Sequence, residues 1–483
     1  MAGVWRPPGA RRTDRGGPGC DKLCRDDRSG AVTEPASPHP GESSSAVSTA
    51  TSAAEPARAR RSNPLPPGAL VIGMALAIQG VTTYAFVVIA NHALAPQTYS
   101  AFSSLWALTF VAAPGLFLPL EQEVGRAASA RRVAGLGAGP VVRRALLLGI
   151  GIAIGVMVLA AAGESPLVGT FFNGQGLMLL GFLVAMAVYA VYYLSRGTLA
   201  GAGRFGGYAT VLVVEGAVRI AAALVLLRAG VTNGGAYGLA ISLPCLIGLA
   251  VVLPRQRGIA APGPPAHWSE LSAALGWLLT GSLLAQALMN VAPLATKALL
   301  SGGDPTAAGR VLNGLIVARI PLFFFQAIQA SLMPKLSADA AAGRFHEFRL
   351  LLRRILLLAA MVVVVSVAGM ALFGPPILQI LFHSSRPLGR GDLALLALGS
   401  EGMMAALALA YACIALRGYR GATAGWISGS VALVLALVVL PGTLLRVEIA
   451  FCVAVAVACA VMGVALTRYL RRAETAHLTS PAG

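Results

Sequence analysis

A few ionisable side chains interrupt long apolar stretches of this sequence, and these are the residues best placed to do chemistry. Glu215 and Arg219 lie four residues apart in VVEGAVRI. That spacing puts both side chains on one face of a helix, where opposite charges attract each other. The simplest interpretation is an internal ion pair, and the alternative is a site that couples transport to proton binding.

Arg319 and Glu401 have no such neighbour in their own apolar segments. Arg319 lies in VARIPLFFFQ, close to Pro321, and proline removes a backbone hydrogen bond and kinks a helix. An ionisable group at the bilayer centre costs at least about 2.5 kcal/mol on insertion scales, so each needs a partner or a function. We expect Arg319 to line a cavity, or else to bond carbonyls freed by the kink. We expect Glu401 to be a coupling site, or a protonated carboxyl bonded across a helix contact.

Motifs for catalysis, nucleotide hydrolysis and metal binding are missing. None of the three lysines follows a glycine, so there is no P-loop to hold the phosphates of ATP. No Gly-x-Ser-x-Gly nucleophile elbow occurs. The six cysteines are scattered and indicate neither a disulfide framework nor a metal site. We therefore expect no enzyme activity, no ATP binding and no metal or other cofactor.

The segments that must position these residues are long enough to cross a bilayer. Only 12% of the 483 residues are charged, and the mean hydropathy is +0.75. About 20 apolar residues span the hydrocarbon core as a helix. We predict an all-α polytopic membrane protein with about twelve such helices. They lie near residues 68–90, 101–121, 144–163, 176–194, 208–228, 234–253, 271–292, 311–332, 352–373, 394–416, 421–440 and 446–468.

The net charge of +18 is distributed as membrane topology requires, which argues against nucleic-acid binding. If the N-terminus is cytoplasmic, most of the 37 lysines and arginines fall in cytoplasmic tails and loops, and few fall in external loops. Positive charge is retained on the cytoplasmic side of a membrane. We therefore expect both termini on the inside of the cytoplasmic membrane, with the basic loops attracted to anionic lipid headgroups.

Shifts in composition predict how the chain is organised. Residues 1–67 are rich in proline, serine, alanine and arginine, and we expect a disordered cytoplasmic tail there. Six helices would form a first half, residues 68–253, and six a second half, residues 271–469. A cytoplasmic linker at residues 254–270 would join them, and a tail at residues 470–483 would end the chain. Similar stretches in both halves, such as RRALLL and RRILLL, favour an internal repeat about an axis along the membrane normal.

Charges also cluster where the second helix meets the cytoplasm, in EQEVGRAASARR. The simplest interpretation is a solvated helix end. Glu121 and Glu123 oppose the helix dipole there, and Arg126 offers local compensation. The corresponding region of the second half carries Lys335 and Arg344. We predict a gate in which the two glutamates pair with Lys335 or Arg344 when the cavity is closed to the cytoplasm.

Two six-helix halves with basic loops after helices two and eight resemble the multidrug/oligosaccharidyl-lipid/polysaccharide (MOP) flippase superfamily. The closest likeness is to its polysaccharide-exporter branch, which includes O-antigen and teichoic-acid flippases. PLEQEVGRAASARR and SRGTLAGAGRFGGYATVLVVEGAVRI carry most of the resemblance. It implies two lobes arranged in a V, as in MATE transporters, and alternating access. The implied cargo is a polyprenyl-diphosphate-linked glycan, a cell-envelope precursor, and enzymes of glycan synthesis are implied partners.

The resemblance also implies two groups of substrate-binding residues. Cationic groups of the second half would meet the diphosphate, which arginine binds through paired hydrogen bonds. Amide side chains would hydrogen-bond the sugars. The cations are Arg319, Lys297 and Arg310, and the amides are Gln79, Gln286 and Asn290.

Three other interpretations stay open. The drug-efflux branch of the superfamily commonly couples to a cation through a carboxylate in its first helix, but residues 68–90 contain no acidic residue. In an ion-coupled antiporter for small amphiphilic molecules, Glu215 or Glu401 would have to replace that carboxylate. A major-facilitator transporter also has twelve helices, but GRAASARR lacks the aspartate of that family's motif. The third is a membrane scaffold that recruits glycan enzymes through its tail.

Overall fold

The computed structural model describes residues 69–271, 274–300, 303–383, 387–442 and 444–479. The predicted disordered tail at residues 1–67 lies outside the described residues. Within the described residues every regular element is a helix and no strand occurs. The prediction of an all-α protein is therefore confirmed.

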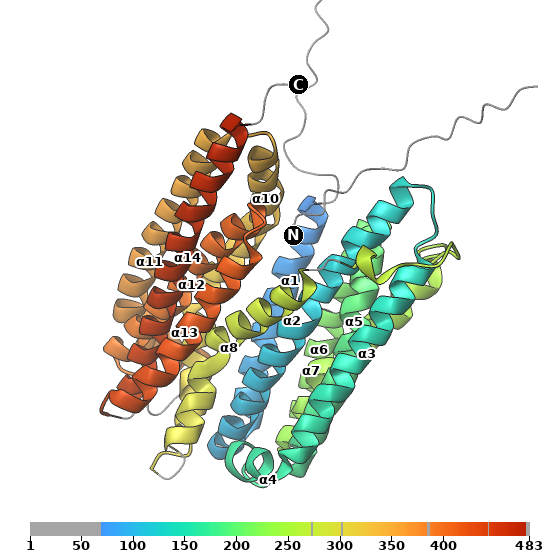
Figure 1. The fold of residues 1–483 in the computed structure, drawn as a ribbon. Helices are drawn as coiled ribbons and strands as arrows, with labels where there is room; N and C mark the ends of the chain where they lie inside the picture. The colour runs from blue at the N-terminus through green and yellow to red at the C-terminus, as the bar shows by residue number, and fades with distance from the viewer. Residues whose placement is uncertain (1–68, 272–273, 301–302, 384–386, 443, 480–483) are drawn as a thin grey trace, which may run out of the picture. The chain divides into compact units, whose positions relative to one another are not determined.

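Eleven described helices are long and apolar enough to cross a membrane. Each coincides with one of the segments predicted from hydropathy. In Figure 1 these helices are coloured from blue to red along the chain. They are α1 Ala69–Ala93, α2 Pro96–Val133, α3 Gly139–Ala162, α5 Gly176–Gly201, α6 Phe205–Arg228, α7 Gly234–Val252, α8 Leu275–Leu300, α11 Phe345–Phe382, α12 Arg390–Ala415, α13 Tyr419–Val439 and α14 Leu444–Thr479. Short helical turns occur at α4 Glu164–Pro166, η1 Leu167–Phe171, η2 Leu253–Arg255 and η3 Trp268–Glu270.

The remaining predicted segment, residues 311–332, is divided into two helices. α9 spans Ala307–Ala318 and α10 spans Ile320–Ala341. Pro321 occupies the first turn of α10. Backbone N–H groups in the first turn have no partner within the helix, so the N–H that proline lacks costs no helical hydrogen bond there. The predicted kink is thus a break, and Arg319 lies at the junction.

α2 runs well past the end of its apolar segment and packs closely against α5. A Cβ atom added to Gly197 would lie 2.4 Å from the carbonyl oxygen of Glu121, and one added to Gly201 would lie 2.8 Å from that of Gly125. Glycine at these positions lets the two backbones touch. One face of the end of α2 is therefore buried against α5, while Gln122, Arg126 and Arg132 are exposed, so this helix end is only partly solvated.

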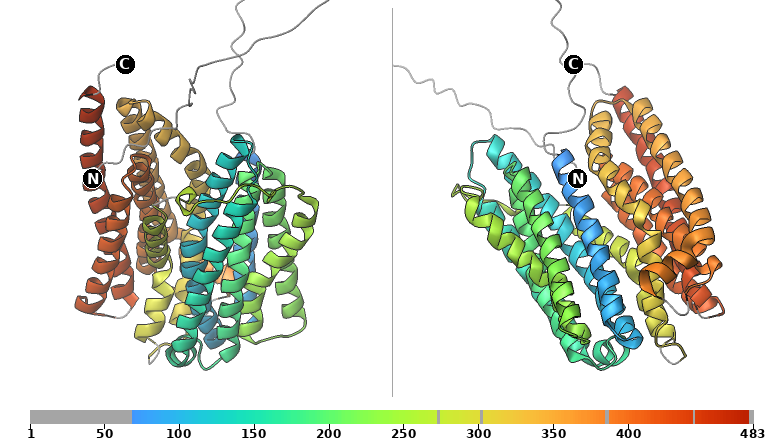
Figure 2. Two further views of the ribbon diagram at one scale, coloured as in Figure 1. Left: turned by 45° about the vertical axis from the view of Figure 1, so that its right-hand side comes forward. Right: turned by 180° about the vertical axis from the view of Figure 1, so that it is seen from behind.

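The two halves meet mainly along α2 and α8. A Cβ atom on Gly115 of α2 would lie 3.0 Å from the Cα atom of Leu283 in α8, so these helices are in close contact. In Figure 2 the blue-to-green helices of the first half gather on one side, and the orange-to-red helices of the second half gather on the other. α14 continues to Thr479, beyond the predicted end of the second half at residue 469.

Hydrogen bonds join the two halves at the end where α1, α8 and α11 finish. One partner in each bond belongs to the first half and the other to the second. The pairs are His92 Nε2 with His383 Nδ1 at 2.7 Å, Tyr99 Oη with Asn313 Oδ1 at 2.5 Å, and Asn173 Oδ1 with Lys297 Nζ at 2.8 Å.

Candidate functional site

Glu215 and Arg219 form an ion pair within α6, at 1% and 2% side-chain exposure. The Glu215 carboxylate also accepts hydrogen bonds from the Tyr192 hydroxyl of α5 and from the Gln79 amide of α1, the latter at 2.7 Å. The amide of Gln79, expected to bind sugar, is thus occupied by this carboxylate. Three helices of the first half are linked through one buried carboxylate.

The guanidinium of Arg219 makes further bonds that complete this network. It donates to the Thr83 hydroxyl at 3.1 Å and to the carbonyl oxygen of Ile241 in α7 at 2.9 Å. A buried ion pair is stable only when its remaining donors and acceptors are satisfied, and loss of one partner leaves an uncompensated charge. The network therefore suits a structural tie between α1, α5, α6 and α7.

A second buried ion pair of the first half joins α2 to α5. Arg196 Nη2 lies 3.3 Å from Glu121 Oε1, and the Tyr208 hydroxyl donates to the same oxygen at 2.7 Å. The Arg196 guanidinium also lies over three tyrosine rings, at 5.1 Å from the centroids of Tyr192 and Tyr193 and 4.9 Å from that of Tyr208. Such cation–π contacts favour a desolvated arginine. Glu121 is held inside the first half by this cluster.

No ion pair of the predicted gate is seen among the described residues. Glu123 accepts from Arg126 at 2.9 Å, which is the local compensation expected from the sequence. Arg344 donates to Asp339 at 2.6 Å within its own half, and Lys335 is exposed. The gate stays a prediction for another conformation. There Glu123 is the better partner, since Glu121 would first have to leave its buried cluster.

Arg196 and Tyr208 are the residues that sequence reasoning missed. The apolar pattern predicts a helix that ends at residue 194, which places Arg196 in a cytoplasmic loop. The structure continues α5 to Gly201, because glycines let its end pack against α2. The signal was present in SRGTLAGAGRF, where an arginine precedes the first of several small residues.

In the second half, Arg319 lies at the junction of α9 and α10 and is 9% exposed. Its Nη1 donates to Asn290 Oδ1 of α8 at 3.2 Å. Within the described part of the chain, its Nε and Nη2 atoms have no acceptor. Tyr84 of α1 and Glu401 of α12 are close enough to interact with it electrostatically. Arg319 therefore keeps unused donors in a buried position.

Glu401 is fully buried in α12. Neither of its carboxylate oxygens receives a hydrogen bond from the described residues, and the adjacent Ser400 hydroxyl is likewise unpartnered. No ion pair with Arg319 is formed among those residues. An ionised carboxylate buried in this way costs several kcal/mol. Glu401 must therefore carry a proton or gain a partner from a ligand or a rearrangement, and the expected bond across a helix contact is not seen.

The other two predicted cations are engaged elsewhere. Lys297 is buried and donates to Asn173 across the halves, while Arg310 is ion-paired with Asp304. Neither joins Arg319. Among the described residues, Arg319 forms no ion pair and keeps two buried donor atoms, Nε and Nη2, without an acceptor.

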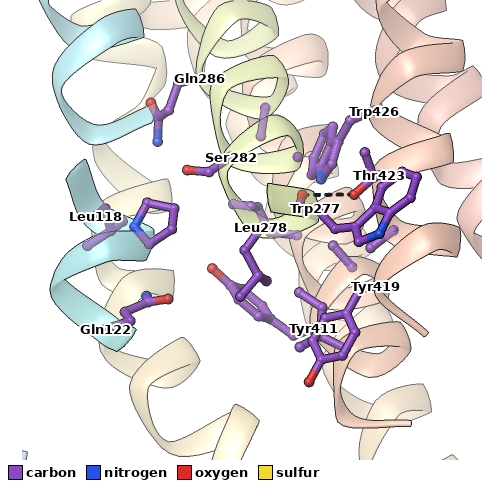
Figure 3. Close-up of a pocket in the computed structure, with 17 residues that line it drawn as sticks. Leu118, Gln122, Trp277, Leu278, Ser282, Gln286, Tyr411, Tyr419, Thr423 and Trp426 are labelled. Atoms are coloured by element: carbon purple, nitrogen blue, oxygen red, sulfur yellow. Dashed lines mark hydrogen bonds between the residues drawn. The ribbon is translucent and has the colours of Figure 1, made fainter. Parts of the chain in front are cut away.

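A pocket of about 110 Å³ lies between α2 of the first half and α8, α12 and α13 of the second. In Figure 3 the rings of Trp277, Tyr411 and Tyr419 lie on the side of the second half, and Gln122 lies on the α2 side. The polar and aromatic residues of the lining are Gln122, Trp277, Ser282, Gln286, Tyr411, Tyr419, Thr423 and Trp426. Aromatic faces combined with a few polar groups are typical of small-molecule sites.

Hydrogen bonds link one lining residue of the pocket to Arg319, although neither Asn290 nor Arg319 lines the pocket itself. Gln286 lines it, and one turn later Asn290 Nδ2 donates to the carbonyl oxygen of Gln286 at 3.0 Å. Asn290 in turn accepts from Arg319. Three of the six predicted substrate-binding residues are thus brought together, and the other three are not.

Comparison with known sequences gives distant relatives only. No family model matches the sequence. Two curated proteins of Mycobacterium tuberculosis, one from strain CDC 1551 / Oshkosh and one from strain ATCC 25618 / H37Rv, are described as uncharacterized. Each is 24% identical over 369 residues, which covers 75% of this chain and 82% of the relative.

Solved structures match the fold closely. An inward-facing multidrug resistance MATE family transporter of the MOP superfamily matches with a TM-score of 0.64 at 15% identity, over 85% of this chain and 99% of that chain. An outward-facing structure described in the same terms matches at 0.63 and 13%, over 84% and 96%. A MATE transporter of Vibrio cholerae matches at 0.62 and 16%, over 84% and 97%. The chain therefore has the MATE fold, as the resemblance implied.

Proposed function

We propose that this chain is a multi-pass membrane transporter that works by alternating access. Two observations support the proposal. The fold is shared by MATE transporters solved in inward-facing and outward-facing conformations. The pocket is formed by both halves, so a movement of one half against the other would open or close it. No step of this mechanism needs ATP.

The cargo that we propose is a lipid-linked glycan of the cell envelope. The observation that carries this proposal is the chain of hydrogen bonds that links Gln286 of the aromatic pocket through Asn290 to Arg319. Aromatic faces and amides can hold sugar rings and hydroxyls. A buried arginine with free donors can bind a phosphate group through paired hydrogen bonds. The prenyl chain would stay among apolar helix surfaces, and enzymes of glycan synthesis would supply and consume the cargo.

Mass spectrometry of lipid-linked glycans in a strain depleted of this protein tests the proposal. We expect one polyprenyl-diphosphate sugar to accumulate, protected from an external glycan-modifying enzyme because it stays in the inner leaflet. Unchanged lipid-linked glycans and unchanged surface polysaccharide would contradict the proposal.

A second candidate function is an ion-coupled antiporter for small amphiphilic molecules. The observation that favours it is Glu401, a buried carboxylate without a hydrogen-bond donor in the described structure. A carboxylate inside the membrane is commonly part of a proton or ion pathway. Gradient-dependent efflux of a cationic dye that is abolished by Glu401→Gln would establish this function in place of the first.

A further inference from the structure

The linker between the halves, residues 254–270, packs against the end of α2 and the start of α3. The backbone N–H of Gly139 donates to the carbonyl oxygen of Ala261 at 2.9 Å. The buried Arg131 donates to both carboxylate oxygens of Glu270, at 2.6 and 2.9 Å, and to the carbonyl oxygen of Pro264 at 3.0 Å. These bonds lower the pKa of Glu270 to about 2. The linker is therefore a fixed part of the first half.

Two glycines show how closely the linker approaches. A Cβ atom on Gly137 would lie 2.0 Å from the carbonyl oxygen of Pro262, and one on Gly263 would lie 2.7 Å from that of Gly137. Any other residue at these positions would force the backbones apart. The linker thus forms a defined wall opposite the first turns of α3.

An open cavity of about 530 Å³ lies between this wall and α3. Arg143 and Arg144 line it from α3, and neither arginine is paired with a carboxylate among the described residues. The guanidinium carbon of Arg144 lies 5.2 Å from the ring centroid of the exposed Trp268. No acidic residue is part of the lining, which includes Leu147 of α3 and Pro262, Pro265 and Ala266 of the linker. The cavity is cationic and has an aromatic edge.

An exposed apolar stripe continues from the cavity along α3. Leu147, Ile150, Ile154 and Val158 are exposed and follow Arg143 at helical spacing, so they share its face. α3 is itself long and apolar enough to cross a membrane. A ligand of the cavity can therefore be anionic at one end and apolar along the rest of its length.

We propose that this cavity binds the headgroup phosphate of an anionic phospholipid, with the acyl chains along the stripe of α3. Arginine recognises phosphate through paired hydrogen bonds. Tryptophan is enriched at the membrane interface, and basic pockets beside membrane helices attract anionic headgroups. The lipid would contact both α3 and the linker, and so reinforce the bonds between Arg131 and Glu270. This site is separate from the pocket proposed for cargo.

The second half supplies a matched control. Arg353 and Arg354 of α11 repeat the pair of arginines, and Leu357 and Met361 continue from them on an exposed face. The cavity that the linker closes does not include this pair among its lining residues. If the cavity holds the lipid, removal of the first arginine pair alone should reduce lipid binding. If positive charge alone holds it, removal of either pair should reduce lipid binding.

The test uses the purified full chain in nanodiscs of phosphatidylcholine mixed with phosphatidylglycerol. Native mass spectrometry measures the phosphatidylglycerol that remains bound after release from the nanodisc. For the double variant Arg143→Gln/Arg144→Gln we expect the retained lipid to fall roughly tenfold or more, while Arg353→Gln/Arg354→Gln retains it. Trp268→Ala should give an intermediate loss. Thermal unfolding of each variant shows that it is folded.

Three outcomes would overturn the proposal. Equal loss in both double variants would indicate general attraction of lipid to surface charge. Full retention in the first double variant would show that the cavity holds no lipid. Displacement of the lipid by inorganic phosphate alone would assign the cavity to a soluble anion. The measurement needs no cargo, so its failure is distinct from failure of the proposed transport function.

Discussion

The buried charged side chains of the two halves differ in how they are paired. In the first half Arg196 contacts Glu121 and Arg219 contacts Glu215. In the second half Arg319 and Glu401 interact through space but form no ion pair, and each keeps polar atoms without a partner among the described residues. Paired buried charges hold a structure together, whereas unpaired ones are available to a ligand or a proton. The comparison predicts a structural role for the two ion pairs of the first half and a ligand-binding or proton-binding role for Arg319 and Glu401.

The largest expected effect is on the ion pair of α6. Arg219→Met leaves Glu215 buried without its counter-charge, which costs about 3–5 kcal/mol when one partner of such a pair is removed. We expect a large fall in the melting temperature of the detergent-solubilised protein. The double variant Glu215→Gln/Arg219→Met should recover part of the loss, since it removes the stranded charge. Additive losses in the double variant would contradict the account.

A smaller effect is expected at the linker. Glu270 has its pKa lowered from the usual 4.5 to about 2 by the hydrogen bonds of Arg131. Its stabilising contribution is therefore complete above about pH 4.5 and is lost as the pH falls toward 2. Glu270→Gln should melt at a lower temperature than the natural protein, by an amount that is constant from about pH 8 to pH 5 and shrinks below that. A difference that grows on acidification would show that the ion pair has another role.

A still smaller effect on stability is expected at Arg319. Arg319→Gln removes no ion pair and loses one hydrogen bond, to Asn290, so stability should change by about 1 kcal/mol or less. Comparison of its melting temperature with that of Arg219→Met measures the difference between the halves directly. A fall as large as that of Arg219→Met would place both arginines in the same structural role.

The smallest effect is expected for Glu401→Gln. Glutamine keeps the shape of the side chain and removes the cost of ionising it, so the melting temperature should stay the same or rise slightly. Transport assays of this variant with and without a proton gradient then distinguish between the two proposed functions. A glycan flippase that needs no gradient keeps its rate, while an antiporter coupled through Glu401 loses it.

The sequence predicts the helices and the local contacts well, because these depend on neighbouring residues. Hydropathy places the membrane helices, and the spacing of Glu215 and Arg219 predicts their contact. Contacts between distant segments could not be predicted in the same way. The bond between Glu121 and Arg196 depends on glycines that let α2 and α5 touch. The helix break at Arg319 and the rings that α8, α12 and α13 bring to one pocket likewise depend on packing.

The measurement that tests the central claim most directly is transfer of a lipid-linked glycan by the purified protein in vesicles, without an ion gradient. An enzyme added outside modifies only the glycans that reach the outer leaflet, and the rate is compared between the natural protein, Arg319→Gln and protein-free vesicles. We predict rapid transfer by the natural protein and a rate close to that of protein-free vesicles for the folded Arg319→Gln variant. Equal rates for the natural protein and Arg319→Gln would contradict a cargo-binding role for the unpaired arginine. No transfer by either protein would contradict the proposed flippase.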